Sequence, residues 1–381
     1  MIARRGLIVG ASVLPFVRSA FAQDAYKAPA SEHALNLVNL LELEQQASSV
    51  LTPGAFGYIA GGAGDEWTLH ENRRAFDDTQ IIPRRLAGFG LPDLSTTVLG
   101  AKMALPVIIS PMAGQGLVHV SAEAGTAKGA GLAGAVFSAP TMSNVTLEDI
   151  ARATQGPKWF QLYYAKDPGL NRAWIKRIEA AGYGAIIFTV DLEFPGNREA
   201  DRRNNFSFPT SLPFANLDGP ARDGGFGGLR DVVKGNLSWD DLSFLRKESK
   251  LPIIVKGILS PADAKLCVER GASAVQVSNH GGRQLDGVQA AIRALPAIVD
   301  AVGSQVPIIM DGGIRRGIDV FKALALGASA VAIGRPALYG LALGGAAGVK
   351  SVLDKLKAEL MLAMKLSGCA SIAGITRAHV T

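Results

Sequence analysis

Eight short apolar runs, each followed by a polar or helical stretch, constrain the fold of this 381-residue chain more than any other feature. Runs of four to six residues rich in Val and Ile are typical of parallel strands that are buried on both faces. Strands that alternate with helices indicate a parallel sheet, and eight such units close a (β/α)8 barrel. The runs span residues 106–110, 135–138, 159–163, 185–189, 252–256, 274–278, 307–311 and 330–334.

The segments around these runs complete an α/β prediction: a single (β/α)8 TIM barrel with an N-terminal helical extension. Amphipathic helices are predicted at residues 146–154, 170–181, 261–270, 287–302 and 320–326. The extension comprises a helical segment at about residues 33–49 and a helix-and-turn segment at 54–74, broken by glycines at 61–64. A long insertion after the fourth strand, residues 193–241, is a candidate lid over the active site, with a disordered surface loop as the alternative.

The first 22 residues have the layout of a secretory signal peptide. Arg4 and Arg5 precede an apolar stretch, and Ala20-Phe21-Ala22 offers a cleavage site of small residues. The adjacent arginines favour the twin-arginine type of signal, with the general secretory route as the alternative. We therefore expect residues 1–22 to be a signal peptide, 23–35 a linker and 36–381 the catalytic domain of an exported, periplasmic protein.

Composition excludes several classes of protein. A hydrophobic fraction of 48% is ample for a core, and no apolar run reaches the roughly 18 residues that span a bilayer. Loss of the signal arginines, Arg18 included, lowers the formal charge from +6 to +3, which is no argument for nucleic acid. Two lone cysteines, Cys267 and Cys369, make neither a disulfide framework nor a zinc site, and we expect no metal.

Polar residues recur at or just past the ends of the apolar runs. In a barrel of parallel strands all carboxyl ends face one mouth, so these side chains should converge there. Solvated loop residues scattered at random would not repeat at one end of the strands. The residues are Gln161, Thr189, Asp191, Lys256, Ser278, His280, Asp311 and Arg335.

The last two strands predict a phosphate site. They end in Asp311-Gly312-Gly313-Ile314-Arg315 and in Gly334-Arg335-Pro336. Glycines let backbone N–H groups approach a phosphate, and arginines supply charge-assisted hydrogen bonds. The alternative is a pair of tight turns with surface arginines. Lys256, at the end of an apolar strand, needs an anion nearby; a reduced flavin is one such partner, and Schiff-base chemistry is the rival role.

The stretch Ser278-Asn279-His280-Gly281-Gly282-Arg283-Gln284-Leu285-Asp286-Gly287 combines a candidate base with a candidate carboxylate clamp. It resembles the signature of the FMN-dependent α-hydroxy acid oxidases and dehydrogenases, the glycolate oxidase and lactate oxidase family. Further blocks match in the same order, at residues 58–68, 159–163, 189–191 and 196–201. The resemblance covers essentially all of residues 36–381, and residues 61–67, 196–198 and 341–345 are most similar to lactate oxidase.

The resemblance implies a role for each matching residue. His280 would be the catalytic base, oriented by Asp191. Arg198 and Arg283 would hold the substrate carboxylate, and Tyr58 and Tyr163 would contact its carboxylate or hydroxyl. FMN would be bound by Pro111, Met112, Ala113, Gln161, Thr189, Lys256, Ser278, Asp311, Gly312, Gly313, Arg315, Gly334 and Arg335. The family also implies a homo-oligomer, a tetramer.

Three positions depart from the family pattern. The register places Met142 where relatives carry an aromatic residue, Pro140 where Ser is common, and residues 192–195 where Pro-Arg is common. A flexible, apolar Met fills irregular space, so we expect the pocket to admit a 2-hydroxy acid larger or more apolar than lactate. The alternative is that the Met142 side chain points away.

The sequence thus predicts FMN-dependent oxidation of an L-2-hydroxy acid, lactate-like or larger, to the 2-oxo acid. The electron acceptor is left open between O₂, a quinone and a periplasmic carrier. A phosphate-binding flavin-dependent isomerase or a lysine aldolase barrel is a rival, but neither gives a role to His280, Arg283 and Arg198 together. A flavin-binding protein without turnover is a third reading, against which the intact base and arginines argue.

Overall fold

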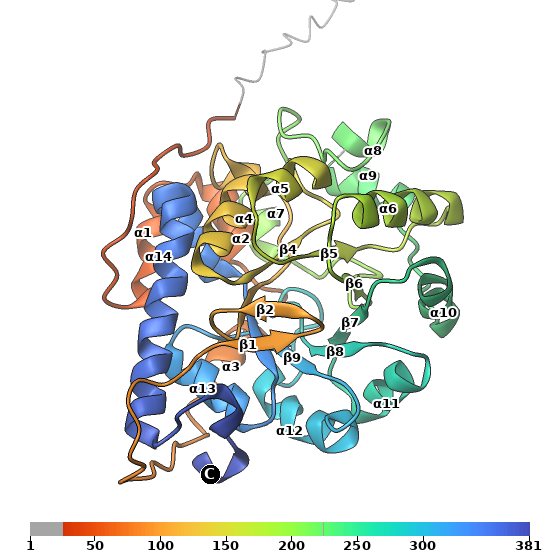
Figure 1. Cartoon of the computed structure of the whole chain (residues 1–381). Helices are drawn as coiled ribbons and strands as arrows, with labels where there is room; N and C mark the ends of the chain where they lie inside the picture. The colour runs from red at the N-terminus through yellow and green to blue at the C-terminus, as the bar shows by residue number, and fades with distance from the viewer. Residues whose placement is uncertain (1–25, 224) are drawn as a thin grey trace, which may run out of the picture.

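A computed structural model describes residues 26–223 and 225–381, so the predicted signal peptide lies outside the described residues. The central element is a closed barrel of eight parallel strands in the order β10-β3-β4-β5-β6-β7-β8-β9, as Figure 1 shows. The (β/α)8 prediction is therefore confirmed. The strands are β3 (Val107–Ile109), β4 (Val136–Ala139), β5 (Lys158–Leu162), β6 (Ile186–Thr189), β7 (Ile253–Ile258), β8 (Ala274–Val277), β9 (Ile308–Asp311) and β10 (Ala330–Ile333).

The strand side chains divide between two cores, because alternate residues of a strand point to opposite faces. One face packs inside the barrel, with Ile108, Val136, Trp159, Ile187, Ile254 and Ile309 among its buried residues. The other face packs against the surrounding helices. An antiparallel hairpin, β1 (Thr96–Val98) and β2 (Ala101–Met103), adds Val98 and Met103 to the inner core. This hairpin, which was not predicted, closes the end of the barrel opposite the carboxyl ends of the strands.

Helices surround the barrel, and the predicted ones are confirmed with slightly different bounds. Polar caps start several of them: the side chains of Thr146, Asp167 and Ser260 accept backbone N–H bonds at their N-termini. The helices after the strands are α4 (Ala122–Ala133), α5 (Leu147–Ala153), α6 (Pro168–Ala180), α10 (Trp239–Glu248), α11 (Pro261–Glu269), α12 (Ala291–Val302), α13 (Gly317–Ala325) and α14 (Arg335–Ser367). Short 3-10 helices are η2 (Gln115–Leu117), η3 (Ile372–Gly374) and η4 (Arg377–His379).

The N-terminal extension is less helical than predicted. Only η1 (Leu40–Glu42) and α1 (Leu43–Ser48) form within the segment 33–49, because the Asn39 side chain caps the helix start by accepting the Leu41 N–H. Helices α2 (Pro53–Ala60) and α3 (Trp67–Arg74) follow, separated by the predicted glycine break.

Within the predicted linker 23–35, the described residues 26–35 contact the barrel domain. The Tyr26 hydroxyl donates to the Leu117 carbonyl at 2.8 Å. The Glu32 carboxylate accepts the backbone N–H groups of Ala346 and Ala347, both at 3.1 Å. These bonds cap the second half of α14, which is interrupted by non-helical backbone at Gly344 and Gly345. The segment is therefore part of the folded domain.

Helix α14 runs along one side of the molecule beside α1 and α4 (Figure 1). It is long and apolar enough by composition to cross a membrane, but 78% of its apolar window is buried inside the protein. A core helix that packs against several neighbours has this composition too. We therefore assign α14 to the core.

The described part of the insertion between β6 and α10 is folded and packs against α2 and the loop after β4. It contains α7 (Glu199–Arg203), α8 (Pro220–Asp223) and α9 (Gly225–Val232). The Phe206 ring stacks on Tyr58 at 5.3 Å, and Asn144 donates to the carbonyls of Leu212 and Pro213, both at 3.1 Å. These contacts agree with the predicted lid rather than with a disordered loop.

Candidate active site

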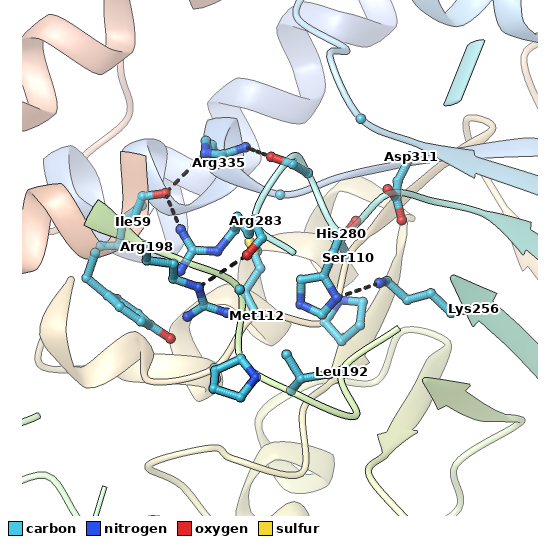
Figure 2. Close-up of a pocket in the computed structure, with 18 of the residues that line it drawn as sticks. Ile59, Ser110, Met112, Leu192, Arg198, Lys256, His280, Arg283, Asp311 and Arg335 are labelled. Carbon is cyan, nitrogen blue, oxygen red and sulfur yellow. Dashed lines mark hydrogen bonds between the residues drawn. The ribbon is translucent and has the colours of Figure 1, made fainter. Parts of the chain in front are cut away.

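A cavity of about 640 Å³ opens at the carboxyl ends of the strands, beneath the insertion. The cavity gathers most of the residues that the sequence predicted for the site, although they come from α2 and from the ends of seven strands. Figure 2 shows several of them around the cavity. Those lining it are Tyr58, Pro111, Met112, Ala113, Tyr163, Arg198, Lys256, His280, Arg283, Asp311, Gly312, Gly313, Arg315, Gly334 and Arg335. Convergence at one mouth follows from the common direction of the strands.

Four predicted residues lie behind the cavity wall rather than on it: Gln161, Thr189, Asp191 and Ser278. The Ser278 hydroxyl donates to Asp311 Oδ1 at 2.8 Å and accepts the His280 backbone N–H at 3.1 Å. It thereby holds the turn on which His280 adopts a left-handed backbone with φ of 57°. Strained backbone of this kind is often found where a side chain must point into a site.

His280, Asp191 and Lys256 form a compact group. His280 Nδ1 lies 2.8 Å from Asp191 Oδ1, and Lys256 Nζ lies 3.3 Å from Asp191 Oδ2. The carboxylate can only accept, so the hydrogen of the neutral imidazole sits on Nδ1 and leaves a lone pair on Nε2. Lys256 Nζ is 3.4 Å from the same Nδ1, which is then a contact between two donors. The arrangement offers an unprotonated Nε2 to the cavity.

Glycine at position 257 makes this group possible. Its φ is 112°, and a Cβ there would lie 2.6 Å from the Asp191 Cβ. Any larger residue would push Asp191 away from its two partners. The close approach coincides with the register shift between β7 and β8 next to Lys256.

Protonation states in the group follow from burial and charge. Burial, helped by the Lys256 charge, lowers the pKa of His280 to about 4 even though Asp191 attracts the proton. Burial alone would raise the pKa of Asp191, but the charges of His280 and Lys256 outweigh it and lower this pKa to about 2. At neutral pH the His280 imidazole is therefore neutral and Asp191 is a carboxylate.

Two guanidinium groups converge on the opposite side of the cavity. Arg283 donates to the Gly61 carbonyl at 2.8 Å and lies 5.0 Å from the centre of the Tyr58 ring. Arg198 reaches toward the Arg283 carbonyl at 3.5 Å. Burial and the nearby Arg198 charge lower the pKa of Arg283 to about 9. Within residues 26–223 and 225–381 neither guanidinium forms an ion pair with a carboxylate, although the charge of Asp201 opposes the lowering of the Arg283 pKa, so the pair is suited to an external anion.

A second pair of arginines lies at the loops after β9 and β10. Arg335 donates to the carbonyls of Ile59, Gly281 and Gly61 at 2.9–3.1 Å, and Arg315 donates to the Ile314 carbonyl at 3.0 Å. Burial lowers the pKa of both arginines, and the charge of Arg335 lowers that of Arg315 further. No described carboxylate forms an ion pair with them. Their position is that of the phosphate site in many (β/α)8 barrels.

Buried polar atoms around the cavity fit a flavin ring. Gln161 Nε2 and Thr189 Oγ1 are buried and have no hydrogen-bond partner among the described residues. An unsatisfied buried polar group costs about 1–3 kcal/mol, so a bound polar molecule would relieve a real penalty. Asp311 accepts from Gln276 at 2.6 Å and keeps free acceptor capacity toward the cavity. Together with the ammonium of Lys256, these groups suit the polar edge and chain of FMN.

Sequence reasoning missed several cavity residues. Apolar contacts come from Ile59, Ile333 and Leu338, and polar ones from residues of the insertion. The four residues 192–195, which depart from the family pattern, all line the cavity as expected. Their place directly after Asp191 was the only local signal. The other residues of the insertion carry no such local signal, because their sequence does not show which of them turn toward the cavity.

The expectation for Met142 is not supported. Its side chain is fully buried in the outer core and is not among the residues that line the cavity. Its carbonyl accepts the Gly114 N–H at 3.1 Å, which ties the loops after β3 and β4 together. Pro140 is also buried. Leu192 and Phe194, unlike Met142, line the cavity.

The sequence of this chain matches the FMN-dependent dehydrogenase family over residues 47–381. The chain belongs to this family. It is 46% identical to an L-lactate oxidase of Lentilactobacillus hilgardii, over 94% of this chain and 98% of that protein. It is 42% identical to glycolate oxidase 3 of Arabidopsis thaliana, over 91% and 96% of the two chains.

Solved structures agree with these relatives. A putative lactate oxidase of Pediococcus acidilactici superposes with a TM-score of 0.87 at 44% identity, covering 92% of this chain and 96% of that one. A mandelate oxidase superposes with a TM-score of 0.84 at 38% identity, covering 91% and 98%. The family resemblance inferred from the motifs is thus confirmed. This family member is an oxidoreductase that acts on CH–OH donors and uses FMN.

Proposed function

We propose that this enzyme oxidises an L-2-hydroxy acid to the corresponding 2-oxo acid. The observation that carries the proposal is the convergence of Arg198 and Arg283 on the cavity that holds His280. A guanidinium fork binds a carboxylate through parallel hydrogen bonds and fixes its orientation. Relatives named for oxidising lactate, glycolate and mandelate, which are all 2-hydroxy acids, support this substrate class.

His280 is the general base in this proposal. With the substrate carboxylate held by the arginines, the hydroxyl-bearing carbon lies between them and the imidazole, and Nε2 accepts a substrate proton. Asp191 fixes the imidazole through Nδ1 at 2.8 Å and stabilises the imidazolium that forms. The phenols of Tyr58 and Tyr163 contact the substrate carboxylate or hydroxyl. Burial raises the pKa of both phenols, so they remain hydrogen-bond donors.

FMN, when bound, takes up the two electrons that leave the substrate. The residues that would hold its ring and ribityl chain are Pro111, Met112, Ala113, Gln161, Thr189, Lys256, Ser278 and Asp311. Those that would hold its phosphate are Gly312, Gly313, Arg315, Gly334 and Arg335. The orphaned atoms of Gln161 and Thr189 and the unpaired arginines support this division.

The test is the visible spectrum of the purified protein, followed by anaerobic mixing with a panel of 2-hydroxy acids. We expect a yellow protein whose released cofactor runs as FMN in chromatography, and bleaching only by acids with a carboxylate next to the carbinol carbon. His280→Ala should keep FMN and reduce it roughly 10² to 10⁴ times more slowly. Arg203→Gln, which changes an arginine outside the cavity, is the control. Bleaching by simple alcohols, or FAD as the cofactor, would refute the proposal.

We further propose that the enzyme is exported to the periplasm through the predicted signal peptide and works there as a homotetramer. The twin-arginine motif supports export of a protein that has already bound its cofactor. Arg4→Lys with Arg5→Lys should keep the full-length protein in the cytoplasm, and light scattering should give four chains. The acceptor is then O₂, a quinone or a periplasmic carrier, and reoxidation rates of the reduced enzyme with each would identify it.

A further inference from the structure

The outer part of the cavity carries more positive charge than the proposed chemistry requires. Eight cationic side chains but only three carboxylates line the cavity. The proposed function uses five of the cations: the clamp of Arg198 and Arg283, the two phosphate-site arginines and Lys256. Three remain without a role, namely Lys166, Arg202 and Arg230. We call these three the outer cations.

The outer cations come from three separate parts of the chain. Lys166 follows β5, Arg202 lies on α7, and Arg230 lies on α9. Lys166 Nζ donates to the Arg230 carbonyl at 2.8 Å, so the loop after β5 and the insertion are joined at this point. The outer cations come from segments that are far apart in the chain and line the same cavity. They are therefore not simply the solvent-exposed face of one helix.

Two neighbouring arginines of α7 differ in whether they form an ion pair within the protein. Arg203 forms an ion pair with Glu199 one turn away and does not line the cavity. Its neighbour Arg202 lines the cavity, and its guanidinium forms no ion pair or hydrogen bond with any residue in the described part of the chain. Arg198 is the N-cap of α7 and has an extended backbone, whereas Arg202 lies near the end of the helix, and both line the cavity. An arginine of the clamp is therefore followed by a second, unused one further out.

The carboxylates of the cavity do not neutralise the outer cations. Glu193 accepts the Leu237 backbone N–H at 2.7 Å, and Asp311 accepts from Gln276 and Ser278. Asp201 lies close enough to Arg283 and Arg198 for both charges to lower its pKa, against the larger effect of burial. Its charge therefore acts on the clamp. The outer part of the cavity is left with an excess of positive charge.

We propose that the outer cations bind a second carboxylate at the far end of the substrate, so that the preferred substrates are 2-hydroxydicarboxylates. This inference rests on the proposed function, because it assumes that the clamp holds the first carboxylate. The clamp and the outer cations line the same cavity, and the proposal is that a single acyclic diacid bridges them. Leu192 and Phe194 would contact the methylene groups between them.

The expected effect is modest, because the outer cations are partly exposed to solvent. An exposed ion pair contributes about 0.2–1 kcal/mol, so Arg202→Gln should lower kcat/KM for 2-hydroxyglutarate about two- to fivefold. The double variant Arg202→Gln, Arg230→Gln should lower it about tenfold, if two such contributions add. The loss should appear in KM and shrink as salt is added, since salt screens exposed charges.

The experiment compares 2-hydroxyglutarate with 2-hydroxyhexanoate, which has a similar length but lacks the distal charge. We would measure kcat and KM for both acids in the wild-type holoenzyme, the single and double variants, and the control Arg203→Gln. We expect the diacid to be preferred in wild type and in the control, and the preference to fall in the outer-cation variants. The ratio of FMN to protein absorbance checks that each variant is folded and loaded.

Two different failures can be told apart. If 2-hydroxyhexanoate or lactate bleaches the flavin but the diacid has no advantage, the second carboxylate site is wrong and the proposed function stands. If Arg202→Gln lowers kcat/KM equally for both acids, the arginine only steers anions and the site is again wrong. If no 2-hydroxy acid bleaches the flavin, the proposed function itself is wrong.

Discussion

Asp191→Asn isolates the charge that stabilises a protonated His280. Asparagine has nearly the same shape as aspartate, and its oxygen can still accept the Nδ1 hydrogen that now lies 2.8 Å from Asp191 Oδ1. In that orientation the tautomer that leaves Nε2 unprotonated is retained, while the amide nitrogen replaces the oxygen that now accepts from Lys256. What is lost is the negative charge that offsets Lys256 when the imidazole takes up a proton.

The magnitude follows from the two distances. At an effective dielectric constant of about 20, a unit charge 2.8 Å away contributes about 6 kcal/mol, and one 3.4 Å away about 5 kcal/mol. With Asp191 present, attraction slightly exceeds the repulsion from Lys256. Without it, the repulsion is unopposed. These values are upper limits for charges that partly rearrange, so we expect flavin reduction to slow by about 10³ to 10⁴.

Anaerobic stopped-flow reduction of the bound flavin by a saturating 2-hydroxy acid measures this step directly. Glu193→Gln is the matched control, because it changes a carboxylate that lines the cavity but accepts the Leu237 N–H and has no contact with His280. The slow rate of Asp191→Asn should persist from pH 6 to 9, where His280 is already neutral. Reduction within about tenfold of wild type, with FMN bound, would show that stabilising the imidazolium is not what limits the rate.

Three further outcomes test other parts of the site. Arg283→Lys should weaken 2-oxo acid binding about tenfold or more, because lysine lacks the planar fork of arginine. Titration of the flavin absorbance with the 2-oxo acid measures this affinity, and an unchanged affinity would show that Arg283 does not hold the carboxylate. Gly313→Ala should yield protein with little FMN and a lower Tm, because φ is 79° and a Cβ would lie 1.9 Å from the Asn72 carbonyl oxygen. Full FMN loading would contradict this. Burial, which outweighs several backbone N–H bonds, raises the pKa of Glu123 from 4.5 to about 7. The unfolded carboxyl loses its proton near pH 4.5 and the folded one near 7, so this group lowers the free energy of unfolding as pH rises between these values, by on the order of 3 kcal/mol. His280, which is buried and neutral, raises the free energy of unfolding as pH rises toward 6.5 and so opposes the effect of Glu123. The free energy of urea unfolding must therefore be compared between wild type and Glu123→Gln at each pH. Identical pH profiles would refute the raised pKa of Glu123.

Much of the fold was predictable because its signals are local. A buried parallel strand needs a short apolar run, and the eight runs match β3 to β10 within one or two residues. Three helix starts are also set locally, because the side chains of Thr146, Asp167 and Ser260 cap the following turn. The hairpin β1–β2 was missed, because each of its strands has only three residues and little periodicity.

The N-terminal segment shows where local signals fail. Residues 33–39 have helical composition but form no helix, because the bonds of this segment go to distant partners. The Leu35 N–H donates to the Ser351 hydroxyl at 3.0 Å, and the His33 N–H donates to the Gly344 carbonyl at 3.2 Å. Contacts that span more than 300 residues leave no trace in a short window. Tertiary hydrogen bonds overrode helix propensity here.

By itself the sequence determined which residues stand at the ends of the strands, and therefore that His280, Asp191 and Lys256 share one mouth. The direction of a parallel strand is enough to imply this. Only the tertiary structure decided that Asp191 lies between the other two, since this depends on the space left by Gly257 on a neighbouring strand. It also decided that Met142 is buried and that Arg202 faces the cavity while Arg203 does not. The direction of a side chain depends on how its whole element packs, and packing is a property of segments far apart in the chain.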